Sequence, residues 1–112
     1  MKLVTAVIRP EKLGDVRQAL EAAGVQGLTI SEASGFGRQK GEKQVYRGAT
    51  FTTNLVPKLK LEILVVDENV SRVVTAILDV TSQGTAGDGK VWVTAVESVI
   101  RVSDRSEGLA AL

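Results

Sequence analysis

Hydrophobic and polar residues alternate with the period of a strand in several short segments of this chain. The clearest is residues 58–66, where aliphatic residues occupy every second position and Lys58, Lys60 and Glu62 fall between them. The first segment is rich in β-branched residues and ends at Pro10, which cannot donate to a ladder but suits the first turn of a helix. The pattern predicts strands over residues 2–9, 27–35, 58–66 and 90–96, and a short further strand over 98–102.

Two other segments repeat their apolar residues at helical spacing. The first covers residues 12–23, and Gly24 supplies its stop. The second follows Asp67, which is the expected N-cap, and ends before Gly84. The apolar positions are Leu13, Val16, Leu20 and Ala23 in the first segment and Val70, Val73, Val74, Ile77 and Leu78 in the second.

The order of these elements is strand, helix, strand, long loop, strand, helix, strand. It predicts one α+β domain over residues 1–112, with a four-stranded antiparallel sheet that carries both helices on one face. This ferredoxin-like βαββαβ arrangement buries both apolar helix stripes at once. Residues 36–56 hold glycines and charges without a sustained period, and so long a loop in so small a domain is usually functional or disordered.

The predicted sheet has more apolar surface than two helices can cover. Residues 2–8 and 91–96 are largely apolar on both sides of their strands. Because both helices lie on one face, the other face needs a different cover. A second copy of the same chain is the expected cover, so the pattern predicts a homo-oligomer.

The composition excludes several kinds of site and partner. The 112 residues include no Cys and no His, which removes disulfides, thiolate and imidazole metal sites, Cys nucleophiles and His-based triads. The net charge of +1 and the 4% of aromatic residues argue against nucleic acid as a partner. The apolar runs are far shorter than the ~20 residues that span a bilayer, so we expect a cytoplasmic protein without membrane insertion.

Two glycine clusters, at residues 35–41 and 84–90, are candidate binding elements. The second matches the first seven positions of a P-loop, but Val91 replaces the Mg²⁺-binding Ser or Thr, and the cluster leads from a helix to a strand. Both departures argue against a true P-loop. Its glycines still let backbone N–H groups converge on an anion beside Lys90, and the alternative is a flexible turn.

Several cations lie near the ends of different predicted strands. Folding or assembly would have to bring them together before they could bind a polyphosphate. The alternative for each cation is that it is an ordinary solvated surface charge. The cations are Arg38, Lys40, Lys58 and Arg101.

Six segments carry a specific resemblance to a known family. They are MKLVTAVIRP at 1–10, GFGRQKG at 35–41, VYRGA at 45–49, VPK at 56–58, GDGKVWV at 87–93 and VIRV at 99–102. Through them the chain resembles the PII nitrogen-regulatory signal-transduction family. The resemblance implies a homotrimer with ATP or ADP in clefts between neighbours. It also implies a glycine loop at about 83–90, a tail at about 102–112 and a protruding loop at about 37–55 that docks on targets.

The resemblance also implies the ligand-binding residues of a sensor. Gln39 would help to hold a Mg²⁺ chelated by ATP and 2-oxoglutarate, and Lys58 would pair with the far carboxylate of that acid. ATP would favour 2-oxoglutarate binding and ADP would not, and the loop would report this to ammonium transporters or to enzymes and regulators of nitrogen metabolism. The implied nucleotide residues are Val7, Thr29, Gly37, Arg38, Gln39, Glu62, Leu64, Gly87, Asp88, Gly89, Lys90 and Arg101.

The chain departs from the usual family pattern at four places. Phe51 stands where many members carry a modifiable Tyr, and Ala49 where some carry a phosphorylated Ser, so we expect neither modification. Residues 83–86 read Gln-Gly-Thr-Ala, which lacks a loop cation that is usual in the family. Ser103 replaces a second tail Arg, which we expect to weaken nucleotide binding about ten- to a hundredfold unless Arg105 compensates.

Two other functions remain open from the sequence. One is a weak ATPase that uses the same glycine loops, and the other is an assembly module with vestigial clefts. The acid–base candidates Glu62, Asp88 and Tyr46 have no visible partner or nucleophile in the sequence. We therefore expect a regulator and not an enzyme.

Overall fold

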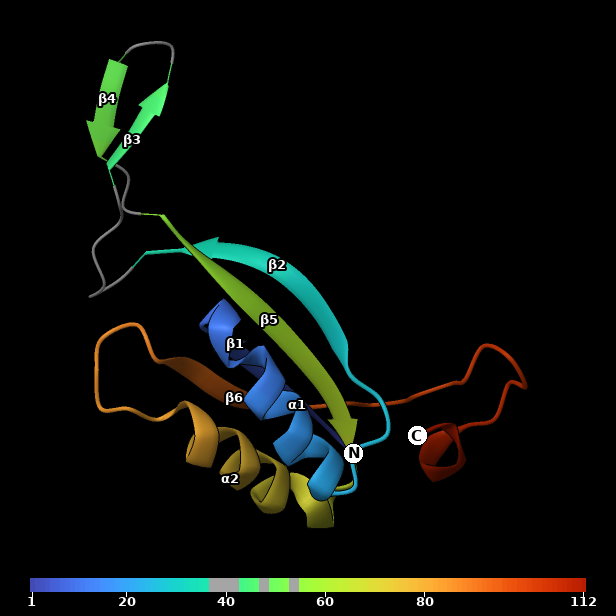
Figure 1. Ribbon diagram of the computed structural model, residues 1–112. Coiled ribbons are helices and arrows are strands. Elements are labelled where there is room, and N and C mark those ends of the chain that lie inside the picture. The colour runs from blue at the N-terminus through green and yellow to red at the C-terminus, as the bar shows by residue number, and fades with distance from the viewer. Residues whose placement is uncertain (37–42, 47–48, 53–54) are drawn as a thin grey trace.

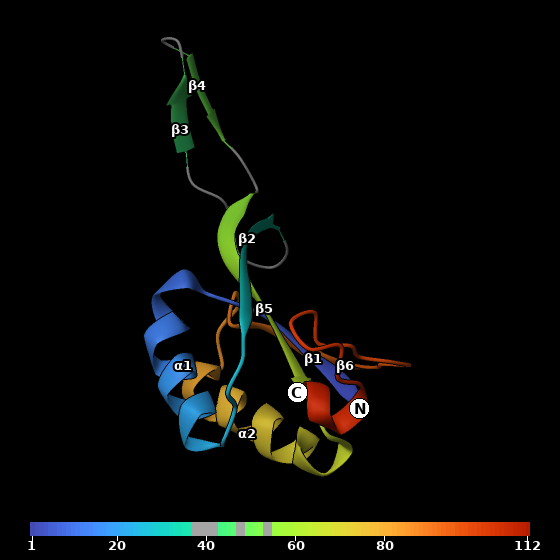
Figure 2. The same cartoon turned by 90° about the vertical axis from the view of Figure 1, so that its right-hand side faces the viewer.

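A four-stranded antiparallel sheet and two helices make up the body of the chain (Figure 1). The computed structural model describes residues 1–36, 43–46, 49–52 and 55–112. The elements of the body are β1 (Lys2–Ile8), α1 (Leu13–Ala22), β2 (Thr29–Gly35), β5 (Val56–Val65), α2 (Val70–Thr81) and β6 (Gly89–Ala95). The strand order is β2-β5-β1-β6, and both helices lie on the same side of the sheet (Figure 2). The ferredoxin-like prediction is confirmed.

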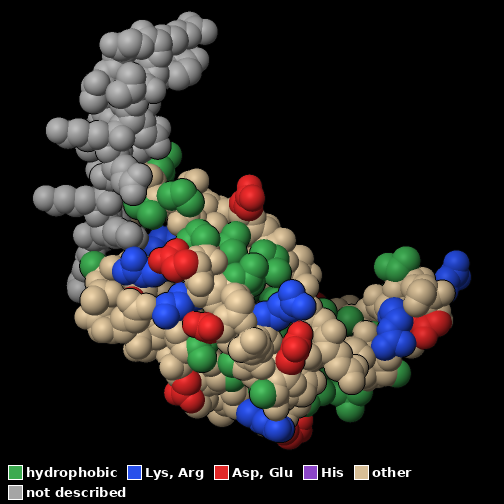
Figure 3. Space-filling view, viewed as in Figure 1, with side chains coloured by type: hydrophobic (Ala, Val, Ile, Leu, Met, Phe, Trp, Pro, Cys, Tyr) green, Lys and Arg blue, Asp and Glu red, His purple; other side chains and the backbone are tan. Residues whose placement is uncertain are grey.

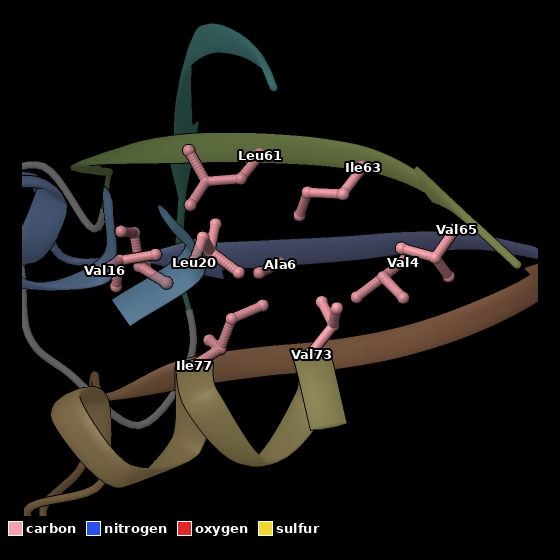
Figure 4. Close-up of a cluster of buried hydrophobic side chains, with 10 residues drawn as sticks. Val4, Ala6, Val16, Leu20, Leu61, Ile63, Val65, Val73 and Ile77 are labelled. Atoms are coloured by element: carbon pink, nitrogen blue, oxygen red, sulfur yellow. The ribbon is translucent and has the colours of Figure 1, made fainter. Parts of the chain in front are cut away.

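The helices cover this side of the sheet because each presents an apolar stripe to it. Val16 and Leu20 of α1 and Val73 and Ile77 of α2 are all at most 2% exposed. They face alternate residues of β1 and β5 (Figure 4). Burying each such aliphatic side chain contributes about 1.5–3 kcal/mol, so this layer is the hydrophobic core. The strand residues in it are Val4, Ala6, Ile8, Leu61, Ile63 and Val65.

Neither helix covers the opposite side of the sheet, which we call the open face. Its residues follow from the register, because residues paired across antiparallel strands point to the same side. The two rows nearest the middle of the sheet are Thr29, Glu62, Thr5, Trp92 and Ser31, Lys60, Val7, Lys90. Trp92 remains 43% exposed there. The open face therefore presents an exposed aromatic ring and charged groups together.

The long segment predicted as a loop contains two short strands. β3 (Lys43–Tyr46) and β4 (Ala49–Thr52) pair in an antiparallel sheet of their own, which Figure 1 shows beyond the end of the main sheet. For these residues the prediction of an aperiodic loop was wrong. Four residues are too few to establish a period, and the signal available was the β-branched and aromatic content of both strands.

Two local predictions were also wrong. Asp67 does not cap α2 but begins a 3-10 turn, Asp67–Asn69, ahead of it. Its carboxylate pairs with the Met1 ammonium, with an N···O distance of 2.9 Å, and the hydrogen bond from that ammonium lowers the pKa of Asp67. In place of the strand at 98–102 there is an isolated bridge between Ile100 and Glu107. A turn closed by the Arg105 N–H and the Arg101 carbonyl reverses the chain there.

Candidate functional site

A cleft of about 700 Å³ opens beside the glycine loop, residues 83–90. Its walls come from three distant parts of the sequence: the end of β1, the start of β5 with residues 35 and 36, and the loop that leads from α2 into β6. Val7, Phe36, Lys58, Lys90 and Trp92 contribute to its lining. The fold thus brings Lys58 and the second glycine cluster to one site, as the anion-binding hypothesis requires.

Gly89 fixes where the glycine loop joins the sheet. Its backbone has φ +108°, and a Cβ built at this position would lie 1.8 Å from the Val7 carbonyl oxygen. No side chain fits there, because β6 approaches β1 through this residue. The glycine is therefore required by a close backbone approach as well as by its dihedral angle.

The amides of the glycine loop converge on an anion, and that anion is the carboxylate of Asp88. Its Oδ2 accepts hydrogen bonds from the N–H groups of Gln83, Gly84 and Thr85 at 2.8, 3.0 and 3.2 Å. Its Oδ1 accepts one from the Thr85 hydroxyl at 2.9 Å. The backbone hydrogen bond from Gln83 is the main reason why the pKa of Asp88 is lowered. As an ionised acceptor for its own loop, Asp88 is poorly suited to general acid chemistry.

Arg9 also contacts this loop, and sequence reasoning missed it. One guanidinium nitrogen, Nη2, lies 2.6 Å from the Ala86 carbonyl oxygen and 3.3 Å from the Thr85 hydroxyl. The same nitrogen is 3.8 Å from Asp88 Oδ1. Arg9 directly follows β1, so this cluster ties the loop to the end of a central strand.

The two lysines of the cleft differ in what they contact. Lys58 Nζ donates to the Gly87 carbonyl at 2.7 Å, and burial, followed by the charge of Arg9, lowers its pKa. Lys58 is therefore not a solvated surface charge. Lys90 is exposed and lines the same cleft. The charges on the helix side of the molecule are mixed (Figure 3), whereas the described cleft lining has these two lysines and the internally bonded Asp88.

The predicted nucleotide residues fall into separate groups in one copy of the chain. Val7 and the residues Gly87 to Lys90 line the cleft. Thr29, Glu62 and Leu64 line a second hollow, of about 610 Å³, which also includes Leu112. Gly37, Arg38 and Gln39 lie outside the described residues, as do Lys40 and the side chain of Tyr46. One copy therefore gathers only part of the predicted set.

Arg101 lies in the C-terminal segment and is held by its neighbours there. Its guanidinium pairs with Asp104 at 3.2 Å and donates to the Leu112 carbonyl at 3.1 Å. Arg105 follows with φ 59°, a left-handed backbone conformation that is rare for a long side chain. Arg101 is thus separate from the cleft lining that the described residues define.

The described part of the chain contains no group of three or more His, Cys, Asp or Glu that could hold a metal ion. None of its helices is both long and apolar enough to cross a membrane. What the cleft offers is therefore lysine ammonium groups and glycine-loop backbone, a donor set that suits phosphate or carboxylate oxygens.

Comparison with known proteins gives a consistent result over the whole chain. The model of the family described as "Nitrogen regulatory protein P-II" matches residues 1–106. The chain is 46% identical to the nitrogen regulatory protein P-II of Rhizobium meliloti (strain 1021) and 44% identical to the nitrogen regulatory protein GlnK of Escherichia coli (strain K12). Both matches span 112 residues and 100% of each chain. The chain belongs to the P-II family of nitrogen regulatory proteins.

Proposed function

We propose that this chain senses adenine nucleotides at the glycine-loop cleft and passes the signal to proteins of nitrogen metabolism. Membership of the P-II family supports a regulatory signalling role in place of an enzymatic one. The observation that carries the nucleotide assignment is the convergence of Lys58, Lys90 and the glycine loop on one cleft. Lys58 is far from the glycine loop and Lys90 in the sequence and meets them only in the fold.

The cleft has the size and chemistry that a nucleotide requires. Its volume of about 700 Å³ lies within the usual range for small-molecule sites. Val7 and Val56 give it an apolar wall, and the two ammonium groups supply positive charge for a phosphate chain. We assign the phosphates to the lysine end of the cleft because an anion gains most from the charges there.

A second copy of the chain completes the proposed site. Thr29, Glu62 and Leu64 lie in the second hollow, and Arg101 lies in the C-terminal segment, so one copy cannot place them around the nucleotide that its own cleft holds. A head-to-tail ring in which each cleft faces the second hollow of its neighbour would unite both groups. We propose a ring of three copies, the number that the resemblance to the family implies, with a nucleotide, ATP or ADP, at each subunit boundary.

The binding of Mg²⁺ and 2-oxoglutarate, as we propose it, depends on bound ATP. The resemblance to the family assigns the proposed ion to ATP and 2-oxoglutarate oxygens, with Gln39 assisting. Lys58 would meet the far carboxylate of 2-oxoglutarate from its position at Gly87. Because that acid then depends on the triphosphate, ATP and ADP give different occupancies, which is the signal.

The proposed partners are ammonium transporters, or enzymes and regulators of nitrogen metabolism, in the cytoplasm. Residues 37–55 adjoin the cleft in sequence through Phe36, which lines it, so occupancy of the cleft can bias that segment. Phe51 lacks the phenol that uridylylation or adenylylation would need. Control by ligands alone, without modification at this position, is the mode of regulation that we propose.

Calorimetric titration tests the proposal. ATP and ADP should each bind, and 2-oxoglutarate should bind with Mg²⁺ and ATP but not with ADP. Lys90→Gln should weaken ATP binding about tenfold or more, which corresponds to the loss of one charge-assisted contact. Lys12→Gln, a change of the same kind outside the cleft lining, serves as the control.

The other two functions predict different results in the same experiments. A weak ATPase would release phosphate during the titration, and Asp88→Ala would abolish that turnover. An assembly module with vestigial clefts would form oligomers without any nucleotide heat. Binding without turnover, enhanced for 2-oxoglutarate by ATP, is the outcome that supports the sensor.

A further inference from the structure

Arg9 contacts the glycine loop but is not among the described residues that line the proposed nucleotide cleft. The described lining of the cleft includes Val7 and Lys58 but not Arg9. The side chains of Arg9 and Asp88 are only 20% and 19% exposed. The hydrogen-bond and ion-pair partners of Arg9 are the loop residues Thr85, Ala86 and Asp88, so Arg9 can act on a ligand through the loop.

We infer that Arg9 is a positioning residue that sets the shape of the glycine loop for the ligand. Its Nη2 reaches three acceptors in the loop: the Ala86 carbonyl, the Thr85 hydroxyl and the Asp88 carboxylate. Asp88 in turn accepts the amides at the start of the loop. Arg9 thus braces the middle of the loop while Asp88 closes its beginning, and the two charges face each other.

The loop needs such a brace because of its composition. Gly84, Gly87 and Gly89 all have positive φ, and glycine loses more conformational freedom on ordering than any other residue. A loop left free by removal of the brace would have to be ordered by the ligand, and that cost would appear as weaker binding. Lys58 contacts this loop at the Gly87 carbonyl, whereas the contacts to Thr85 and Ala86 come from Arg9.

This inference rests on the proposed nucleotide cleft and adds to it a residue outside the described cleft lining. Arg9→Gln removes the charge and should weaken ATP binding about tenfold, whereas Arg9→Lys keeps the charge and should recover most of the affinity. Arg17→Gln is the matched control, since Arg17 is 69% exposed on α1 and pairs with Glu21. Calorimetry with Mg-ATP is the first measurement.

Hydrogen exchange of the protein without ligand is the second measurement. In Arg9→Gln the amides of Gly84 and Thr85 should exchange faster, while those of Val4 and Ile63 in the core strands keep their protection. Unchanged exchange in the loop together with unchanged ATP affinity would overturn the inference. Equal loss of protection in loop and core would also overturn it, because Arg9 would then stabilise the whole fold.

The two measurements separate this inference from the proposed function. If the unaltered protein bound no ATP, the nucleotide proposal would fail, and the exchange comparison would still decide whether Arg9 positions the loop. If the unaltered protein bound ATP and both Arg9→Gln and Arg17→Gln bound it equally well, the cleft would stand and the role of Arg9 would fall.

Discussion

The glycine loop and the C-terminal tail, residues 102–112, differ in whether their polar groups and apolar side chains find partners within one copy of the chain. In the loop, amides bind Asp88 and carbonyls bind Arg9 and Lys58. In the tail, polar groups also bond to one another, but apolar side chains remain exposed: Val102 by 93% and Leu109 by 70%. One copy thus supplies hydrogen-bond partners to the loop, whereas it leaves apolar side chains of the tail exposed.

This difference shows which half of the proposed site one copy can organise alone. A preorganised loop binds a ligand without an ordering cost, so its variants should act on affinity. Exposed apolar side chains in one segment mark a contact surface, so tail variants should act on assembly. Arg101 lies directly before the tail, so the proposed trimer would bring Arg101 and the tail to the cleft of a neighbouring copy.

Gly89→Ala should have the largest effect on the glycine loop. The added Cβ would collide with the Val7 carbonyl oxygen, and the backbone would have to leave φ +108°. The two effects together should lower the free energy of unfolding by about 3–5 kcal/mol, measured by urea denaturation. Gly27→Ala is the control, because nothing lies within 4 Å of its Cβ position. Equal stability of the two variants would contradict the close approach of β6 to β1.

Val102→Ser combined with Leu109→Ser tests the tail. If a neighbouring copy covers these side chains, the variant should lose about 2–4 kcal/mol of association free energy and dissociate at micromolar concentration in sedimentation experiments. Leu78→Ser, which changes an apolar side chain that is 45% exposed on α2, should leave the oligomer intact. An oligomer unaffected by the tail variant would exclude the tail from the subunit contact.

Asp88→Asn replaces the charged acceptor of the loop amides by a neutral one. The amides of Gln83 and Gly84 should exchange several-fold faster in the variant, because the neutral oxygen is a weaker acceptor. In the unaltered protein the lowered pKa of Asp88 means that its contribution is complete above about pH 3.9 and is lost as the pH falls through the lowered value. Loop protection that stayed constant while the Asp88 carboxyl took up its proton would contradict this role.

The sequence predicted the sheet and the helices because their periods were repeated over enough residues. Leu61 and Ile63 on one side of β5 and Lys60 and Glu62 on the other make that alternation visible. The four-residue strands β3 and β4 were too short to show a period. The strand predicted after Glu97 is absent, and a turn reverses the chain there. Periodicity was therefore a reliable guide to the core and a poor one to the hairpin and the tail.

The site was predicted only in part, because its contacts join residues that are distant in the chain. The glycines and Lys58 were visible as residue types suited to anions. Arg9 was not, since it stands 77 positions from Ala86 and nothing local marks it. The role of Asp88 was equally hidden, because a carboxylate in a glycine loop can face a ligand or the loop's own amides, and only the fold shows which groups it meets.

Gly14→Ala should give the smallest effect and calibrates the others. Gly14 lies in α1, outside both the loop and the tail, with nothing within 4 Å of its Cβ position. Alanine should raise the free energy of unfolding by about 0.5–1 kcal/mol through helix propensity. Nucleotide affinity and oligomeric state should not change. A stability loss in urea denaturation would show that the outer side of α1 is less open than described.

Fluorescence of Trp92 during titration with ATP tests the central claim most directly. Trp92 is the single Trp of the chain, lines the cleft and is 43% exposed. ATP should change its emission in a saturable way in the unaltered protein, and Lys90→Gln should move the midpoint about tenfold higher. Emission that stays constant up to millimolar ATP, in a protein that sediments as a monomer, would contradict a nucleotide cleft completed by neighbouring copies.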